Sequence, residues 1–451
     1  MESNRKVKTD NCGSIRYKIL SMIDLNFLRE NPQLVQKAAR DKGIDIDVDH
    51  ILEIDKKHRE LQVSVQTLRE ERNLFLKSIE GKPTSLQIEK GKNIKDKLEK
   101  EEKALKAVSE ELKDNLLKIP NIPAKDTPIG PDSKFNKEIK KWGKIPKFDF
   151  PIKNHVEIGN KLGILDLVAG AKVSGFRGYY LKNEGALLHW AVLNFAFTKM
   201  VSYGFTPMVP PTLIHEFVLL GSGHFPFGKQ DVYQIVNAGK METGEEIKTP
   251  IYLSGTSEPS LLAYFADKIL NEKELPIKVC ALTQCYRSEV GDYGKDVKGL
   301  YRIHEFTKVE QVVICKDDLK ESEKLQQEMQ SISEEILQEL NLPYHVVQNS
   351  TGDMGAGKYR MFDTETWMPA RGNFGETHSN SNLTDWQARR LNIKFKNKEV
   401  ITNYCYTLNN TVIASPRILI AILENYQQED GSVIIPEVLQ KYTGFNKISP
   451  K

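Results

Sequence analysis

Apolar residues recur at heptad spacing in two successive stretches, and this pattern restricts the fold more than any other feature of the chain. The first stretch has separations of seven, four, three, seven and four residues, given by Ile54, Leu61, Val65, Leu68, Phe75 and Ile79. The second stretch carries Ile94, Leu98, Leu105, Val108, Leu112 and Ile119. Such spacing places the apolar side chains on one stripe of a helix. Because the turn sequence EGKPTS separates the stretches, they predict an antiparallel coiled coil over about residues 50–119.

The polar residues of this coiled coil indicate how it is used. Each helix would hold about 30 residues at ~1.5 Å each, which gives a hairpin of roughly 45 Å. Most positions outside the seam are charged or amide residues, so we expect an arm that projects rather than a helix pair that packs on the body. The lysines near its tip could contact phosphates, although such a charge run is usually only a solvated face: Lys82, Lys90, Lys92, Lys95 and Lys97.

Turn signals divide the rest of the chain. A small helical unit is expected from Met22 to about Val48, with a helix that begins at Asn31 and Pro32 and ends at Gly43. Pro120 and Pro123 forbid continuation of the arm. We therefore expect an N-terminal domain over 22–123, a linker over 124–149 and a body over 150–451. The basic residues 1–21 are expected to be a disordered extension, with an organellar targeting peptide as the alternative.

Composition excludes several classes of protein. The net charge of the 451 residues is +3, which is too small for general nucleic-acid binding, so any RNA contact must be local. The five cysteines show no CxxC spacing, which favours a reducing, cytoplasmic compartment and argues against zinc. No apolar run approaches the about 18 residues that a membrane span needs.

The body is predicted to be an α+β domain. Its strands and helices are mixed without βαβ alternation or a P-loop, which favours an antiparallel sheet. Periodicity predicts a helix over 186–201 and a strand over 205–209, which ends at Pro210 and Pro211.

Residues 285–310 read CYRSEVGDYGKDVKGLYRIHEFTKVE and carry the clearest chemical pattern. Strand alternation would place Arg287 and Glu289 on one face, and Arg302, His304, Phe306, Lys308 and Glu310 on another. The loop between them holds Gly291, Gly294, Lys295, Lys298 and Gly299. Guanidinium groups, an aromatic ring and carboxylates together suit a polyphosphate nucleotide. Periodicity alone leaves this reading and a solvated charged hairpin about equally favoured.

The string of residues 285–310 closely resembles motif 2 of class II aminoacyl-tRNA synthetases, and its RSE, RxHxF and KVE spacings resemble the seryl-tRNA synthetase version. Residues 155–211 resemble motif 1, which implies a homodimer, and residues 407–427 resemble motif 3. The resemblance extends over nearly everything from Met22 to Phe445, the arm included. It implies a class II catalytic domain built on an antiparallel sheet and preceded by a coiled-coil arm.

The resemblance also implies an ATP site. Arg287 and Arg417 would be the catalytic cations, Glu289 would hold the adenine amino group and Phe306 would stack on the ring. The ATP-binding residues would be Arg287, Glu289, Arg302, Phe306, Glu376, Ser379 and Arg417. Arg417 begins a predicted helix, where a cation is unfavourable unless an anion lies nearby.

A magnesium site and a serine pocket complete the implied active site. Glu376 and Ser379 offer the hard oxygen ligands that Mg²⁺ accepts together with phosphate oxygens. Asn380 departs from the cysteine common in the family, which puts the local loop geometry in question. The serine-binding residues would be Thr256, Glu258, Arg287, Glu310, Asn409 and Thr411. Thr256 and Glu258 are expected on one strand face, and Asn409 and Thr411 on another.

The implied function is ATP-dependent activation of L-serine and transfer of the seryl group to tRNA(Ser), and to tRNA(Sec) where it is present. The tRNA would bind through the arm and the motif 2 loop. Two alternatives remain: an amino-acid ligase that loads a carrier protein, and a catalytically inactive RNA-binding paralogue. Carrier-loading relatives lack such an arm, and the intact motif residues argue against inactivity.

Overall fold

The computed structural model describes residues 23–237, 239–240, 244–290, 299–397 and 399–450. It divides into two compact units, one formed by the chain up to Arg29 with Asp49–Leu116, the other by Glu30–Val48 with Leu117–Lys451. The expected extension over 1–21 lies outside the described residues, and so do Gly291, Gly294, Lys295 and Lys298 of the motif 2 loop.

The first unit contains the coiled coil that the heptads predict. Helices α3 (Val48–Lys77) and α4 (Ser85–Leu116) bury a seam that includes Ile54, Val65, Ile94, Leu98, Val108 and Leu112. Across this seam the His58 ring lies 3.1 Å from the Ser109 hydroxyl. At the turn, Thr84 and Gln87 exchange hydrogen bonds as a capping box that starts α4. The prediction was wrong for the last residue of each stretch, because Ile79 and Ile119 lie beyond the ends of the helices.

Two short helices precede the arm. Helix α1 spans Leu25–Glu30 and helix α2 spans Pro32–Asp41. As predicted, proline occupies the first turn of α2, and Gly43 follows the helix with a φ of +67°.

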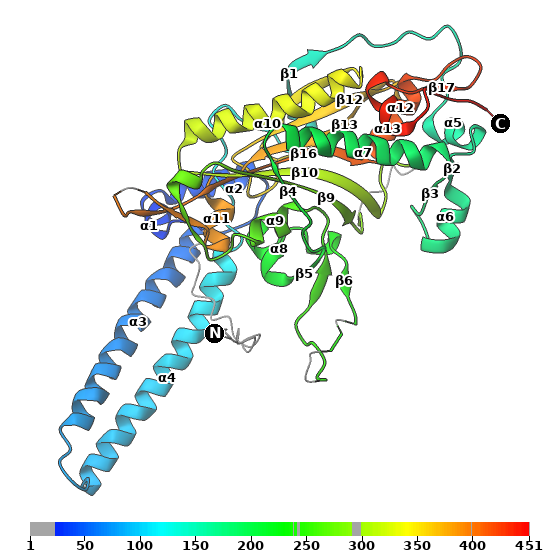
Figure 1. The fold of residues 1–451 in the computed structure, drawn as a ribbon. Coiled ribbons are helices and arrows are strands. Elements are labelled where there is room, and N and C mark those ends of the chain that lie inside the picture. The colour runs from blue at the N-terminus through cyan, green and yellow to red at the C-terminus, as the bar shows by residue number, and fades with distance from the viewer. Residues whose placement is uncertain (1–22, 238, 241–243, 291–298, 398, 451) are drawn as a thin grey trace, which may run out of the picture. The chain divides into compact units, whose positions relative to one another are not determined.

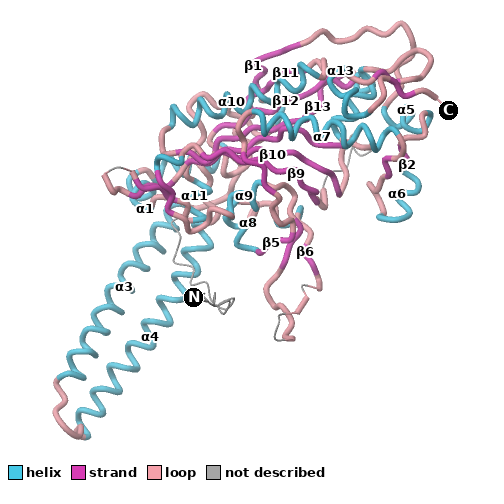
Figure 2. Tube along the Cα trace, viewed as in Figure 1, coloured by secondary structure: helices cyan, strands magenta, loops and turns pink. Residues whose placement is uncertain are grey.

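The second unit is built on an eight-stranded sheet, which Figure 2 shows as a group of strands between helices. The strand order is β1-β11-β12-β13-β16-β10-β9-β4, and all pairs are antiparallel except the parallel pair β4 and β9. In this order the strands are Lys137–Trp142, Tyr344–Gln348, Arg360–Met368, Asn373–Asn382, Tyr406–Ser415, Glu305–Cys315, Ile277–Tyr286 and Thr206–Met208. The prediction of an α+β domain around an antiparallel sheet is confirmed, and the segment expected as a linker contributes β1.

Helices cover the two faces of this sheet (Figure 1). Side chains of β10 alternate between them: Val309 and Val313 pack with α7 (Glu184–Ser202), α10 (Leu319–Glu339) and α12 (Arg417–Asn425), whereas Val312 and Ile314 pack with α9 (Glu258–Ala263) and α11 (Trp386–Leu391). The first face therefore holds the larger apolar core. The second face leaves room for a cavity near the start of β10.

The remaining elements are short. The helices are α5 (His155–Lys161), α6 (Leu167–Ser174), α8 (Glu216–Ser222) and α13 (Glu437–Thr443). The small sheets use β2 (Leu165–Asp166), β3 (Tyr180–Leu181), β5 (Leu213–His215), β6 (Gln234–Ile235), β7 (Ile251–Leu253), β8 (Ile269–Asn271), β14 (Lys394–Lys396), β15 (Thr402–Tyr404), β17 (Val433–Ile434) and β18 (Lys447–Ile448). The predicted helix over 186–201 and strand over 205–209 correspond to α7 and β4. Among the described helices, none has the length and apolar character needed to cross a bilayer.

Candidate active site

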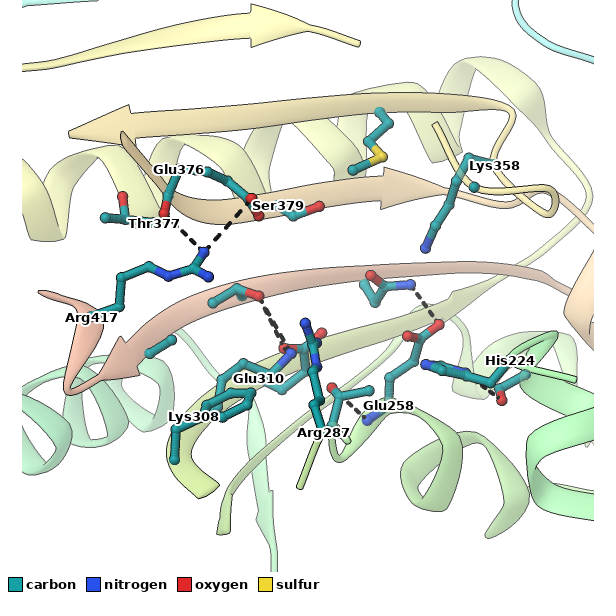
Figure 3. A pocket seen from close by; sticks show the side chains of 18 of the residues that line it. His224, Glu258, Arg287, Lys308, Glu310, Lys358, Glu376, Thr377, Ser379 and Arg417 are labelled. Carbon is teal, nitrogen blue, oxygen red and sulfur yellow. Dashed lines mark hydrogen bonds and ion pairs between the residues drawn. The ribbon is translucent and has the colours of Figure 1, made fainter. Parts of the chain in front are cut away.

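A cavity of about 360 Å³ lies on the second face of the large sheet. Every described site residue predicted from the sequence lines it except Arg302: Thr256, Glu258, Arg287, Glu289, Phe306, Glu310, Glu376, Ser379, Asn409, Thr411 and Arg417. Figure 3 shows Glu376, Ser379 and Arg417 on one side, and His224 and Glu258 on the other. The cavity thus brings together side chains from distant parts of the sequence.

Strand β10 supplies the floor. Phe306, Lys308 and Glu310 occupy every second position of the strand and share the face that lines the cavity, as the strand period predicted. The Lys308 ammonium lies 2.6 Å from the Glu310 carboxylate, and both side chains are less than a tenth exposed. Burial raises the pKa of Glu310, although the ion pair with Lys308 opposes that shift. A buried anion is therefore held in place by an adjacent cation.

The outer end of the predicted hairpin differs from a regular strand pair. Strand β9 ends at Tyr286, so Arg287 and Glu289 follow it, and Arg302 and His304 precede β10; their assignment to strand faces was wrong. The Arg287 backbone N–H still donates to the His304 carbonyl over 2.9 Å. Glu289 has a φ of +51°, which rotates its side chain out of the strand alternation.

Two contacts fix the polar groups at this end of the cavity. The Arg302 guanidinium donates to the Glu289 carboxylate over 3.1 Å, and Arg302 itself does not line the cavity. The Arg287 guanidinium lies 5.4 Å from the centre of the Phe306 ring and donates through Nε to the Gly255 carbonyl over 3.3 Å. Arg287 is thereby positioned between an aromatic ring and the turn Thr256–Glu258, which we call the TxE turn.

Thr256 and Glu258 reach the cavity from a turn rather than from a strand. Strand β7 ends at Leu253 and Glu258 begins α9, so the predicted strand face was wrong for this pair. The Glu258 carboxylate is buried and accepts hydrogen bonds from Gln387 over 2.6 Å and from Asn409 over 2.7 Å. Burial alone would raise the pKa of Glu258, but Lys358, His224 and the Gln387 bond outweigh it and lower that pKa. Glu258 thus offers a fixed negative charge.

Strand β16 supplies the neighbouring acceptors. Asn409 and Thr411 share its cavity face, as predicted. The Thr411 hydroxyl donates to the Glu310 carboxylate over 3.4 Å. Together with Glu258, these groups form a cluster rich in hydrogen-bond acceptors, which suits an ammonium group and a hydroxyl.

Glu376 and Ser379 lie on β13, where residues three apart would normally face opposite sides. The register with β12 shifts so that Thr364 pairs with His378 and the next residue, Glu365, pairs with Glu376. The extra residue, Thr377, is a β-bulge that turns both Glu376 and Ser379 toward the cavity.

The departure at Asn380 has a different environment. Asn380 lies within β13 and is buried, and its amide donates to the Gln326 carbonyl over 2.9 Å and to the Gln330 side chain over 3.1 Å. Both partners belong to α10, on the face away from the cavity. Asn380 therefore bonds to the core helix, and strand β13 continues through it.

Arg417 occupies the first position of α12, as predicted, and has the anionic neighbour that this position requires. Its guanidinium lies 3.7 Å from the Glu376 carboxylate and donates to the Glu376 carbonyl over 3.0 Å. The same guanidinium stacks 4.5 Å from the centre of the Tyr301 ring. A cation, a carboxylate and a hydroxyl thus meet at one side of the cavity.

A magnesium ion fits the donors on this side. Asp363 is buried next to Glu376 and Ser379, and burial together with the Glu376 charge raises its pKa well above the usual value. A buried carboxyl whose pKa is raised by a neighbouring carboxylate marks a place where a cation would be favourable. No group of three or more metal-ligating side chains was found among the described residues. The donors present suit Mg²⁺, which takes few protein ligands when phosphate oxygens are available.

Several cavity residues received no role from the sequence. Lys308 lies on the predicted face of β10, so the strand period could have identified it. Lys358 follows the glycine-rich run GAG, which is a weak signal for a ligand-facing loop. His224 carries no sequence signal; burial lowers its pKa to about 4, so its ring is neutral near pH 7.

Comparison with known proteins agrees with this geometry. Family models match at residues 22–123, described as the seryl-tRNA synthetase N-terminal domain, and at residues 240–426, described as the tRNA synthetase class II core domain (G, H, P, S and T). A serine–tRNA ligase from Deinococcus radiodurans is 41% identical over 95% of this chain and 99% of its own length.

Solved structures give the same result. Seryl-tRNA synthetase from Pyrococcus horikoshii, complexed with ATP, has a TM-score of 0.84 and 36% identity over 95% of this chain and 100% of its own. The cytoplasmic serine–tRNA ligase of Naegleria fowleri, in complex with AMP, has a TM-score of 0.81 and 28% identity over 96% and 99% of the two chains. The chain therefore belongs to the seryl-tRNA synthetase family of class II aminoacyl-tRNA synthetases.

Proposed function

We propose that the cavity activates L-serine with ATP and then transfers the seryl group to the 3′ end of tRNA(Ser), and of tRNA(Sec) where it is present. In the first step a serine carboxylate oxygen bonds to the α-phosphorus and the bond to pyrophosphate breaks. In the second, a terminal ribose hydroxyl attacks the seryl carbonyl and AMP leaves. The observation that carries this proposal is the separation of the cavity into an acceptor-rich end around Glu258 and a phosphate-compatible end around Arg417.

At the nucleotide end, cations and an aromatic ring match the parts of ATP. Arg287 would bridge the α-phosphate and the serine carboxylate, because its guanidinium lies beside both the TxE turn and Phe306. Phe306 would stack on the adenine and Glu289 would hold its amino group. Arg302 and Arg417 would steady the triphosphate, and Arg302 also fixes the Glu289 carboxylate. Catalysis then depends on positioning and on charge stabilisation in the in-line transition state.

At the serine end, a buried carboxylate faces the amino acid. Glu258 with Thr256 would accept hydrogen bonds from the serine ammonium, while Glu310, Asn409 and Thr411 would bind the rest of the substrate. A site that hydrogen-bonds the hydroxyl rejects alanine, because its buried polar groups would be left without partners.

Glu376 and Ser379 would hold Mg²⁺, with Asp363 beside them. When bound, the ion would neutralise charge on the triphosphate oxygens. Contacts with Glu376 and Tyr301 fix the Arg417 guanidinium, which would then be held in place to bind the phosphates.

The arm would recognise the shape and phosphates of the tRNA, with the motif 2 loop as a second contact. A homodimer is supported by large apolar side chains that are half or more exposed near the motif 1 resemblance, among them Val168, Val173, Phe176 and Trp190. We expect the protein to be cytoplasmic.

The decisive experiment measures amino-acid-dependent exchange of pyrophosphate into ATP across the twenty amino acids. Serine alone should give strong exchange, and the same preparation should charge tRNA(Ser). No exchange with any amino acid would favour the inactive paralogue. Serine-dependent exchange without tRNA charging, but with loading of a carrier protein, would favour the carrier ligase.

A further inference from the structure

A lysine outside the cavity holds one of its walls. Lys42, directly after α2, is 6% exposed. Its ammonium donates to the carbonyls of Lys358 over 2.6 Å and of Ala356 over 2.9 Å, and lies 3.5 Å from the Gly355 carbonyl. These carbonyls belong to the loop Gly355–Lys358, all four residues of which line the cavity.

Burial of the Lys42 ammonium costs free energy that its contacts must offset. An ammonium removed from water loses much hydration free energy, and the described contacts of Lys42 are carbonyl dipoles rather than carboxylates. Burial, and then the charge of Lys358, hold the pKa of Lys42 well below that of an ordinary lysine. By contrast, Lys37 on the same helix forms a partly exposed ion pair with Asp41. The buried Lys42 ammonium is therefore stabilised only while the carbonyls of the Gly355–Lys358 loop keep their present arrangement.

The loop is packed from its other side as well. A Cβ atom at Gly357 would come within 2.6 Å of the Trp386 ring, so the loop lies directly against that ring. Figure 3 shows Lys358 pointing from this loop into the cavity, opposite Glu258. Lys358 is also among the charges that lower the pKa of Glu258. A shift of the loop would therefore change the surroundings of the proposed ammonium-binding carboxylate.

A second residue holds the same loop. The Asn121 backbone N–H donates to the Ala356 carbonyl over 2.9 Å, and its side-chain amide donates to the Gly357 carbonyl over 3.1 Å. In the sequence Lys42 precedes α3 and Asn121 follows α4. The chain segments that lead into and out of the arm thus both donate to the Gly355–Lys358 loop.

We propose that Lys42 is a positioning residue for the serine end of the cavity: its ammonium fixes the Gly355–Lys358 loop, and the loop sets the distance between Lys358 and Glu258. This inference rests on the proposed function, since it assumes that the Glu258 end binds serine. Without the ammonium, the loop carbonyls lose a charged donor, and the loop moves away from the arrangement that binds the amino acid.

The test compares Lys42→Met, which keeps the length of the side chain, with Lys37→Met as the matched surface control. In pyrophosphate exchange, Lys42→Met should raise the KM for serine by about tenfold or more, as expected for loss of charged hydrogen bonds. The KM for ATP should change less than about twofold, and Lys37→Met should match the wild type. A purely structural role would not separate the two substrates.

Asn121→Ala provides a milder second variant, which should raise the KM for serine in the same selective way but by less. It decides the outcome if Lys42→Met does not fold. Equal increases in both KM values, or an unchanged KM for serine, would overturn the role of Lys42. A wild-type protein without serine-dependent exchange would instead overturn the proposed function, so the two failures are distinguishable.

Discussion

The coiled-coil unit and the cavity are built in opposite ways. The coiled coil repeats one kind of contact along two helices, so each apolar layer from Ile54 to Leu112 resembles the next. In the cavity each polar group occurs once, and its partners come from different strands and turns, as with Glu258, Gln387 and Asn409. A repeated contact can be predicted from the spacing of residues, and the coiled coil should tolerate a single substitution. Where single groups from different elements meet, as in the cavity, the site should be sensitive to the loss of any one of them.

Removal of the arm tests this contrast most strongly. Because His58 and Ser109 face each other across the seam, residues 59–108 can be replaced by a short glycine-serine link. Charging of tRNA(Ser) should fall by at least about 10³-fold, since the proposed phosphate contacts of the arm would be lost together. Serine-dependent pyrophosphate exchange should stay within about twofold of the wild type. Equal loss of both activities would show that the arm also supports the cavity.

Arg287→Ala is the corresponding change in the cavity. Loss of this proposed transition-state cation should lower the rate of pyrophosphate exchange by about 10² to 10³-fold. The control is Arg69→Ala on the arm, where the guanidinium is half exposed and the exchange rate should not change. Similar rates for the two variants would remove Arg287 from the reaction.

Within the arm, buried layers should matter more than exposed apolar residues. Leu112 is fully buried, so Leu112→Ala should destabilise the arm by about 2 to 5 kcal/mol. Leu74, which is 69% exposed on the facing helix, provides a matched control that should change stability by less than about 0.5 kcal/mol. Hydrogen exchange of arm amides would measure both effects, and a similar cost for both would contradict the seam assignment.

The smallest effect is expected for an ion pair on the arm surface. The Arg69 guanidinium lies 2.7 Å from the Glu102 carboxylate, but both side chains are about half exposed. A double-mutant cycle with Arg69→Met and Glu102→Gln should give a coupling energy of about 0 to 1 kcal/mol that decreases with added salt. A larger, salt-insensitive value would show that the arm, like the cavity, depends on single charges.

The sequence predicted what is periodic or has a recognisable motif. The heptads predicted α3 and α4, and the motif resemblances led to Arg287, Glu376 and Arg417, which line one cavity. Spacing could not place Glu289, because its positive φ departs from strand geometry. It also gave Lys358 and His224 no role, because they come from loops whose proximity to Glu258 exists only after the sheet has formed.

The bulge at Thr377 changes the phase in which side chains of β13 alternate between the two faces of the sheet. Before it, every second side chain follows the phase of Glu376; after it, the phase is that of Ser379. A deletion of Thr377 would leave Glu376 and Ser379 two residues apart on a regular strand and still on one face, so their three-residue spacing exists only because the bulge is present. The three-residue spacing of Glu376 and Ser379 therefore depends on the backbone bulge as much as on the two side chains.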